Sequence, residues 1–131
     1  MWTLDDDREA KGLLRAMAEA ESLPINAKHG AAEGLVESLH ERGVHYDVVV
    51  VDPPRAGLGE AVAGHLAAVV GERLVYVSCD PSTLARDLKV LVAGGLRIVD
   101  VTVFDMMPMT AEVEVVVALE RAQRAAGGGR A

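Results

Sequence analysis

The chain has 131 residues, half of them hydrophobic and only 3% aromatic, with a formal net charge of −7. This length suits one domain whose core is filled by Val, Leu and Ala. No apolar run approaches the roughly 20 residues of a membrane span, and the single cysteine excludes a disulfide framework within the chain. The acid excess argues against a protein that binds nucleic acid by its own basic surface. The start, MWTLDDDREA, is unlike a signal peptide, so we expect a cytoplasmic protein.

Short apolar runs alternate with helical patterns along the chain. The patterns predict strands at 1–4, 25–29, 46–54, 73–79, 96–105 and 112–120, and helices at 5–23, 31–43, 59–71 and 81–95. This alternation predicts an α/β fold with a mostly parallel sheet. The last two predicted strands are too close in sequence for a parallel crossover, so they should pair antiparallel. We expect one domain over 1–120 and a flexible tail over 121–131.

Four consecutive valines, 48–51, lie in the strand predicted at 46–54. Strands of a parallel sheet that is covered on both faces have such continuous apolar runs, whereas half-exposed strands alternate apolar and polar residues. We therefore expect this strand to be buried on both faces.

Polar residues follow three of the predicted strands. These segments are Asp52-Pro53-Pro54-Arg55, Ser78-Cys79-Asp80-Pro81 and the loop 104–110. In open α/β sheets, ligands bind beyond the carboxyl ends of the strands. The three segments therefore predict one functional edge of the sheet.

Cys79, the only cysteine, has two interpretations. A free cysteine is often a small apolar residue in the core. Here, however, Asp80 can cap a helix and Pro81 suits its first position. The partial positive charge of a helix N-terminus favours a reactive thiolate. The residues alone leave both a core residue and a nucleophile open.

Carboxylates and a guanidinium accompany Cys79 at the predicted edge. Asp52 follows four valines and precedes two prolines, and Arg55 could hold a phosphate or carboxylate. The alternative is that these prolines only end the strand. Glu114 lies in a valine-rich strand, where a carboxylate is costly unless it is paired or functional. Glu112, Glu114 and Val116 would share one face, and the alternative is that this face is solvated at the sheet edge.

Together these segments resemble a known family. VVVDPPRAGL (49–58), YVSCDPSTLARDL (76–88) and DMMPMTAEVE (105–114) resemble, in order and spacing, the C-terminal part of the RNA (uracil-5-)-methyltransferases. These enzymes make 5-methyluridine in ribosomal and transfer RNA with S-adenosylmethionine (SAM). The resemblance implies a Rossmann-like class I SAM-dependent methyltransferase sheet, mostly parallel with an antiparallel last strand.

The resemblance also implies a covalent mechanism. The Cys79 thiolate would add to uracil C6, which makes C5 nucleophilic enough to take a methyl group. A base would then remove the C5 proton so that the cysteine can leave. The family pattern assigns this role to Glu114. Glu112 stands where the family has His, which puts a second carboxylate two residues from that base.

Binding roles follow from the same resemblance. Asp5 corresponds to the acidic residue that takes the ribose hydroxyls of the cofactor, and Asp52 would help to hold the cofactor or the uracil edge. Arg55 and Arg86 are candidates for RNA phosphate contacts or for structural pairing. The four histidines share no metal-ligand spacing, and we expect no metal site.

Two features of the family pattern are missing from the sequence. It has no glycine-rich turn after a first Rossmann strand, and no N-terminal RNA-binding domain. We therefore expect a fragment that carries the catalytic half and lacks the first strand. Strands near 1–5 and 47–52 should then pair directly, or a second copy or a missing N-terminal half should fill the gap.

Two alternative functions remain open. The chain could be inactive, or part of a split enzyme that needs a partner chain. It could also be a methyltransferase that acts on another atom, because Asp-Pro-Pro recurs in amino-group methylases.

Overall fold

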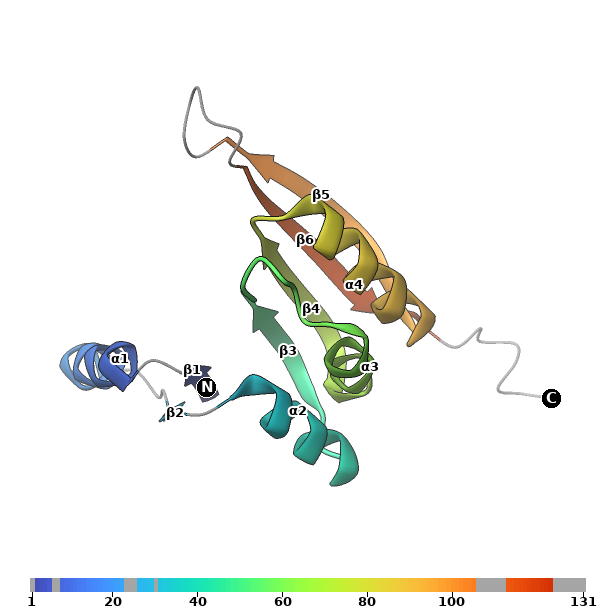
Figure 1. The fold of residues 1–131 in the computed structure, drawn as a ribbon. Coiled ribbons are helices and arrows are strands. Elements are labelled where there is room, and N and C mark those ends of the chain that lie inside the picture. The colour runs from blue at the N-terminus through green and yellow to red at the C-terminus, as the bar shows by residue number, and fades with distance from the viewer. Residues whose placement is uncertain (1, 6–7, 23–25, 30, 106–112, 124–131) are drawn as a thin grey trace. The chain divides into compact units, whose positions relative to one another are not determined.

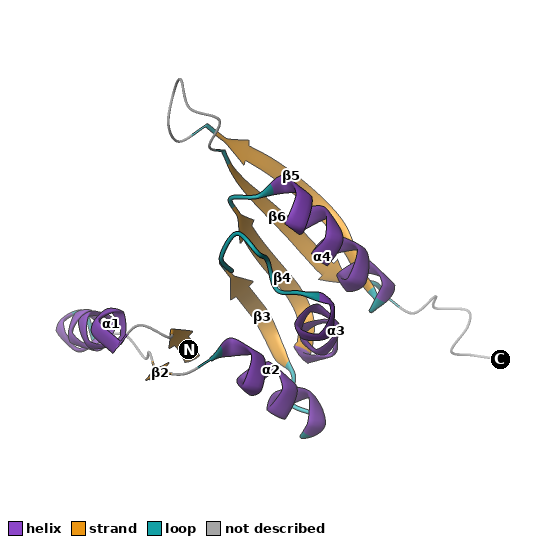
Figure 2. Ribbon diagram, in the orientation of Figure 1, coloured by secondary structure: helices purple, strands orange, loops and turns teal. Residues whose placement is uncertain are grey.

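The computed structural model describes residues 2–5, 8–22, 26–29, 31–105 and 113–123. Its elements are β1 (Trp2–Asp5), α1 (Arg8–Ala20), β2 (Asn26–His29), α2 (Ala32–Glu41), β3 (Tyr46–Val51), α3 (Glu60–Val69), β4 (Val70–Ser78), α4 (Pro81–Ala93), β5 (Leu96–Phe104) and β6 (Glu114–Arg121). Figure 2 shows the same helices and strands by class. The predicted order of strands and helices is confirmed. The expected tail, 121–131, lies outside the described residues from 124 onward.

The chain divides into two compact units, Met1–Ser38 and Leu39–Ala131. In the first unit, β1 and β2 pair in parallel, from Trp2 opposite Asn26 to Asp5 opposite His29. The prediction that the strands near 1–5 and 47–52 pair directly is wrong, because β1 and β3 belong to different sheets. Within the described residues, β3 pairs only with β4. Among all the described residues of the chain, no helix is long and apolar enough to cross a membrane.

The second unit contains a four-stranded sheet in the order β3-β4-β6-β5 (Figure 1). β3 and β4 are parallel, and β6 runs antiparallel to both of its neighbours. The predicted antiparallel pairing of the last two strands is therefore confirmed. β6 has a neighbouring strand on each side. The alternative that Glu114 lies on an outermost strand, with its face solvated there, is therefore wrong.

The core of this unit lies between the sheet and two helices, α3 and α4, which cross one face of it in Figure 1. The strands contribute Leu74, Tyr76, Val117 and Leu119, and the helices contribute Leu66, Ala67, Leu84 and Leu91, all at most 5% exposed. Alternate residues of each strand point to this face. Hydrophobic burial here is the main source of stability of the unit.

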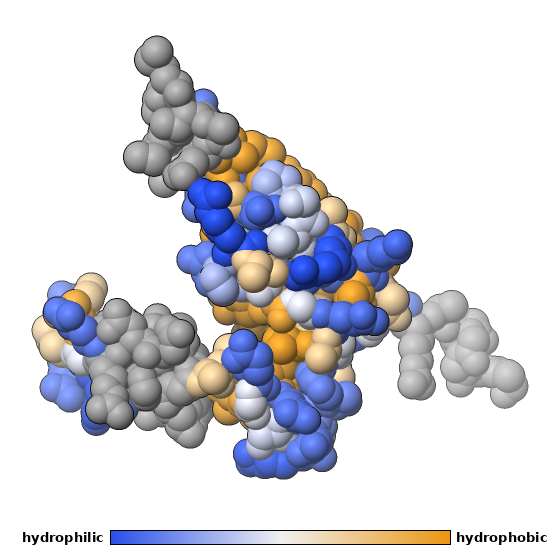
Figure 3. Space-filling model, viewed as in Figure 1, coloured by the Kyte–Doolittle hydropathy of each residue, from blue (hydrophilic) through white to orange (hydrophobic). Residues whose placement is uncertain are grey.

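The opposite face of the sheet is apolar and open. Val48 and Val50 of β3 are 59% and 65% exposed, so the prediction that this strand is buried on both faces is wrong. The register aligns Val50 with Val75 of β4 and Val75 with Ala118 of β6, which extends the apolar surface across three strands. A continuous run of valines is typical of a strand that is covered on both faces, and α3 and α4 cover only the other face of this sheet. Apolar surface also follows the outer edge of β5, beside the hydrophilic surface of α4 (Figure 3).

Gly94, the C-cap of α4, allows α3 and α4 to pack closely. A Cβ added at Gly94 would lie 2.5 Å from the Cβ of Ala67 in α3. We expect Gly94→Ala to lower the free energy of unfolding by about 1–3 kcal/mol, as overpacking does. Urea denaturation followed by circular dichroism measures this change.

Gly64→Ala is the matched control. Gly64 lies in the middle of α3 with no atom within 4 Å of an added Cβ. Because glycine in an exposed helix interior is unfavourable relative to alanine by roughly 0.5–1 kcal/mol, this variant should be more stable than the wild type. Equal effects of the two substitutions would contradict the packing inferred at Gly94.

Candidate active site

Of the predicted functional residues, Asp52, Cys79 and Glu114 lie at one edge of the four-stranded sheet, where β3 and β4 end and β6 begins (Figure 1). The register of β4 with β6 runs as far as Ser78 opposite Val115. Cys79 directly follows β4 and Glu114 begins β6, so both residues lie at this end of the β4–β6 ladder. Asp52, exposed, follows β3 on the other side of β4. The antiparallel insertion of β6 thus brings Glu114 to a residue 35 positions earlier in the sequence.

Cys79 lies in a short turn between β4 and α4 and is half-buried. The hydroxyl of Ser78, itself 4% exposed, braces this turn. Its oxygen accepts from the backbone N–H of Asp80 at 3.1 Å and lies 3.0 Å from the Asp80 carbonyl. The thiol is therefore held in a fixed turn that is partly open to solvent, which differs from a fully buried core cysteine.

The predicted helix start after Cys79 is confirmed. Asp80 is the N-cap of α4 and Pro81 occupies the first helical position. The Asp80 carboxylate accepts from the backbone N–H groups of Ser82 and Thr83 at 2.9 and 3.1 Å, and from the Ser82 hydroxyl at 2.6 Å. These bonds lower the pKa of Asp80, with the Ser82 hydroxyl as the largest cause. The carboxylate is committed to the helix end and stays ionised there.

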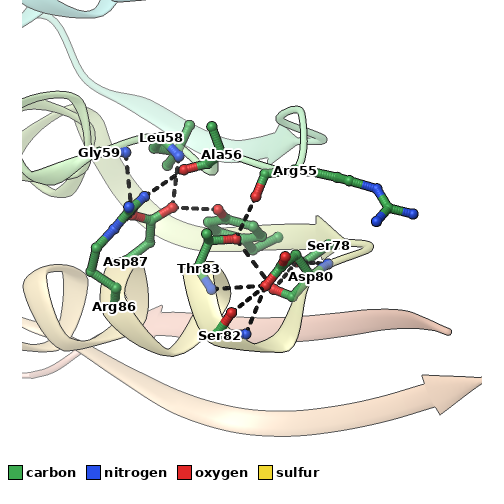
Figure 4. Close-up of polar contacts among 11 residues, drawn as sticks. Arg55, Ala56, Leu58, Gly59, Ser78, Asp80, Ser82, Thr83, Arg86 and Asp87 are labelled. Carbon is green, nitrogen blue, oxygen red and sulfur yellow. Dashed lines mark hydrogen bonds and ion pairs between the residues drawn. The ribbon is translucent and has the colours of Figure 1, made fainter. Parts of the chain in front are cut away.

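The loop between β3 and α3, residues 52–59, is fastened to α4 (Figure 4). The Thr83 hydroxyl lies 2.8 Å from the Arg55 carbonyl oxygen, and Arg86 Nη2 donates to the Ala56 carbonyl at 2.6 Å. Further along, the Asp87 carboxylate accepts from the backbone N–H of Leu58 at 2.7 Å. One helix thus carries both the turn with Cys79 at its start and the contacts that hold the Asp52–Arg55 segment.

The two arginines predicted for RNA contacts differ in their surroundings. Arg86 forms an ion pair with Asp87 at 3.1 Å as well as its bond to Ala56, so its guanidinium serves structural pairing. The side chain of Arg55 extends away from this cluster in Figure 4, and Arg55 is exposed. Its charge also contributes to the lowered pKa of Asp80.

Glu114 has an unusual environment for a carboxylate. The residue is half-buried, and its Oε2 atom is buried without a hydrogen-bond partner among the described residues. Burying a carboxylate oxygen without a donor costs free energy that most structural positions avoid. An atom in this state suits a group that takes up a proton during a reaction.

Other predicted residues fall partly or wholly outside the described residues. Asp5 is the last residue of β1, and the position of its side chain is outside the described part. Glu112 and the methionines of the 106–112 segment also lie outside it. Among the residues that are described, no group of three or more His, Cys, Asp or Glu could hold a metal ion.

Sequence reasoning missed Asp87, which is fully buried and is the most connected polar residue near the edge. The helical spacing of the apolar residues of α4 could have indicated its burial. Leu84 and Leu91 are the buried apolar residues of α4, and Asp87 stands between them on the same face. A carboxylate in an apolar helical stripe must find hydrogen-bond donors, because an unpaired one would be too costly there.

Comparison with solved structures defines the class of protein. The chain is similar to the Pyrococcus abyssi tRNA (uracil-54, C5)-methyltransferase in complex with S-adenosyl-L-homocysteine, with a TM-score of 0.72 and 32% identity, over 90% of this chain and 28% of that one. A putative SAM-dependent methyltransferase from Streptococcus mutans has a TM-score of 0.69 over 91% of this chain and 38% of its own, at 11% identity, which shows the fold alone. The fold is the Rossmann-like class I fold of SAM-dependent methyltransferases.

The family follows from the sequence itself. Residues 18–122 match the tRNA (uracil-5-)-methyltransferase family, and the chain belongs to it. An RNA methyltransferase of unestablished specificity from Bacillus cereus is 45% identical over 95 residues, which are 72% of this chain and 21% of that protein. One from Thermotoga maritima is 54% identical over 78 residues, 60% of this chain and 18% of its own length. The chain thus spans about a fifth of the length of these relatives.

The N-cap bonds of Asp80 predict a pH dependence of stability. Because the folded-state pKa is lowered, Asp80 contributes stability above its unfolded pKa of about 3.9. That contribution is lost as the pH falls through the folded pKa. We expect Asp80→Ala to be less stable than the wild type at pH 7, with a difference that shrinks below pH of about 4. Urea denaturation at a series of pH values measures this difference.

Asp100→Ala is the control, because Asp100 is an exposed aspartate on β5, away from any helix end. Its stability difference from the wild type should be small at every pH. A difference for Asp80→Ala that stays constant down to low pH would show that the carboxylate charge plays no part in the cap.

Proposed function

We propose that residues 1–120 are the C-terminal part of the catalytic domain of a SAM-dependent RNA (uracil-5-)-methyltransferase. Cys79 is the nucleophile and Glu114 the base. The observation that supports the proposal is the strand register that ends at Ser78 and Val115, because Cys79 and Glu114 are the next residues at this end of the two strands. A nucleophile and a base must both reach one pyrimidine ring, and two adjacent strand ends meet that requirement.

In this reaction the Cys79 thiolate forms a bond to uracil C6, and the electron pair of the C5–C6 double bond moves to C5 and O4. SAM, when bound, supplies the methyl group that C5 takes up. Glu114 then removes the proton from C5. The Sγ–C6 bond breaks, the double bond re-forms and Cys79 returns to its thiolate. The buried, unpartnered Oε2 of Glu114 supports its role as proton acceptor.

Asp52 and Asp5 are proposed for the cofactor side. Asp5 is the last residue of the parallel strand β1, and Asp52 directly follows the parallel strand β3. The carboxyl ends of strands are the usual location of ligand-binding groups in such sheets. Carboxylates are suitable acceptors for the hydroxyl groups of a nucleoside, so the residues fit the group that the family uses. The acceptor capacity of Asp52 is accessible, since the residue is exposed.

The substrate is proposed to be ribosomal or transfer RNA in the cytoplasm. Arg55 is the candidate for a phosphate contact, because its side chain extends outward at the functional edge. Arg86 is assigned to structural pairing instead. With a net charge of −7, the chain needs further basic surface from another part of the enzyme to bind RNA firmly.

The first test is mass spectrometry of the chain after incubation with a short 5-fluorouridine RNA and SAM. Fluorine at C5 cannot leave as a proton does, so the enzyme should stay attached to its RNA. We expect an adduct in the wild type and none in Cys79→Ala. Absence of an adduct together with a Cys79 that a small alkylating reagent does not modify would overturn the assignment of the nucleophile.

Glu114→Gln tests the base separately. The amide cannot take up the C5 proton, so the variant should form an adduct with ordinary uridine RNA that the wild type releases. Loss of turnover should be about 10²-fold or more, as for removal of a general base. Glu120→Gln is the control, since Glu120 lies on the same strand and pairs with Arg73 and Arg97 far from the edge. Full turnover in Glu114→Gln would exclude Glu114 as the base.

A second candidate function is that of one half of an assembled enzyme. The exposed face around Val48 and Val50 favours it, as does the outer edge of β3, which pairs with no strand in the described part of the chain. Relatives are about five times as long as the matched segment. We propose that polypeptide corresponding to their remaining part covers this face, with a strand along β3. Unpaired backbone groups of β3 and an apolar face are both suited to that partner.

Light scattering after size exclusion tests this assembly. The chain is mixed with the Bacillus cereus relative from which the matched segment has been deleted, and a one-to-one complex is expected. Val50→Lys should weaken the complex, whereas Val92→Lys on the outer side of α4 should not. A homodimer of the chain alone would mean that a second copy covers the face, and a monomer in both samples would contradict the proposed docking.

A further inference from the structure

The carboxylate of Asp87 is fully buried and surrounded by donors. Oδ2 accepts from the Tyr76 hydroxyl at 2.5 Å and from the Leu58 N–H at 2.7 Å. Oδ1 accepts from the Gly59 N–H at 3.2 Å and from Arg86 Nη2 and Nε at 3.1 and 3.3 Å. A carboxylate offers about four lone-pair sites, so its capacity is filled. All these groups are placed to donate to the carboxylate of Asp87.

The loop lies so close to this carboxylate that only glycine fits at position 57. A Cβ at Gly57 would lie 2.5 Å from Asp87 Oδ2 and 2.8 Å from Arg86 Nη2. Gly57 also has a φ of +74°, a left-handed conformation that suits glycine. Its N–H donates to the Pro54 carbonyl at 2.8 Å and closes a turn that contains Arg55. The position of Arg55 therefore depends both on the Thr83 hydroxyl, which bonds to its carbonyl oxygen, and on the contact between this loop and Asp87.

The turn that carries Cys79 is held independently. Its bonds come from Ser78 and from the cap formed by Asp80 at the start of α4. Asp87 lies almost two turns further along the same helix and bonds to none of these groups. Loss of the Asp87 contacts would therefore loosen the loop at Leu58 and Gly59, while the bonds within the Cys79 turn would remain.

We propose that Asp87 is a positioning residue for RNA binding: its buried carboxylate fastens the 55–59 loop to α4 and so holds Arg55 at the functional edge. This rests on the proposed function, because Arg55 acts on RNA only if the chain binds RNA. Binding of RNA and the chemical steps thus depend on different residues. Asp87 governs how well RNA is held, and Cys79 and Glu114 govern the chemistry.

Asp87→Asn is the informative variant, because it keeps the shape and removes the charge. Its NH₂ group would face at least one of the present donors, leaving a buried N–H without an acceptor. Tyr76→Phe removes one donor and keeps the others, so it should give a smaller effect in the same direction. Leu91→Ala is the control: Leu91 is fully buried one turn further along α4, and its truncation destabilises the helix packing without touching the loop.

The test measures adduct formation with 5-fluorouridine RNA at increasing RNA concentration, together with amide hydrogen exchange. For Asp87→Asn we expect the half-saturating RNA concentration to rise roughly tenfold with little change in the maximal rate. Exchange at Leu58 and Gly59 should be faster by a similar factor, about tenfold. Leu91→Ala should lose stability but leave the half-saturating concentration unchanged, because it only lowers the folded fraction.

The outcomes separate the two proposals. If the wild type forms an adduct and Asp87→Asn has the same half-saturating concentration, the positioning role is wrong. The role is likewise wrong if Leu58 and Gly59 exchange no faster in the variant. If the wild type forms no adduct, the proposed function fails, and the exchange data alone decide whether Asp87 holds the loop.

Discussion

The antiparallel insertion of β6 between β4 and β5 determines the rest of the arrangement. Because β6 enters the sheet from the edge where β4 ends, its first residue stands beside the turn that leaves β4. In a purely parallel sheet the start of every strand lies at the opposite edge from the loops that bind ligands. Reversal of one strand thus places the first residue of a strand, Glu114, at an edge otherwise formed by strand ends.

The polar contacts near this edge form two groups with different structural roles. Ser78 and Asp80 bond within the turn and set the direction in which α4 begins. Asp87, Arg86 and Thr83 bond from α4 to the neighbouring loop. Burial raises the pKa of Tyr76, with its bond to Asp87 as the second cause, so the phenol stays a donor at any physiological pH. The ionised aspartate therefore keeps a permanent set of partners.

Sequence reasoning recovered the elements because their signals are local. Capping by Asp80 and the valine runs are features of neighbouring residues, and they correctly predict a helix start and strands. The exposure of Val48 was not predictable, because a run of valines is typical of a strand covered on both faces, and the described part of this unit does not cover that face. Asp87 was missed because its partners at positions 58, 59 and 76 become neighbours only after folding.

The connections between strands and helices are unequal at the two edges of the sheet. At the functional edge, residues 52–59 join β3 to α3 and residues 105–113 join β5 to β6. At the other edge α3 ends at Val69 and β4 begins at Val70, with Arg121 donating to the carbonyl groups of Ala67 and Val70 at that junction. A one-residue insertion there would turn the whole of β4 over and exchange its core residues for its outer ones. The length of the chain at this junction is therefore fixed by the core, whereas the longer connection between β3 and α3 does not set the register of β4.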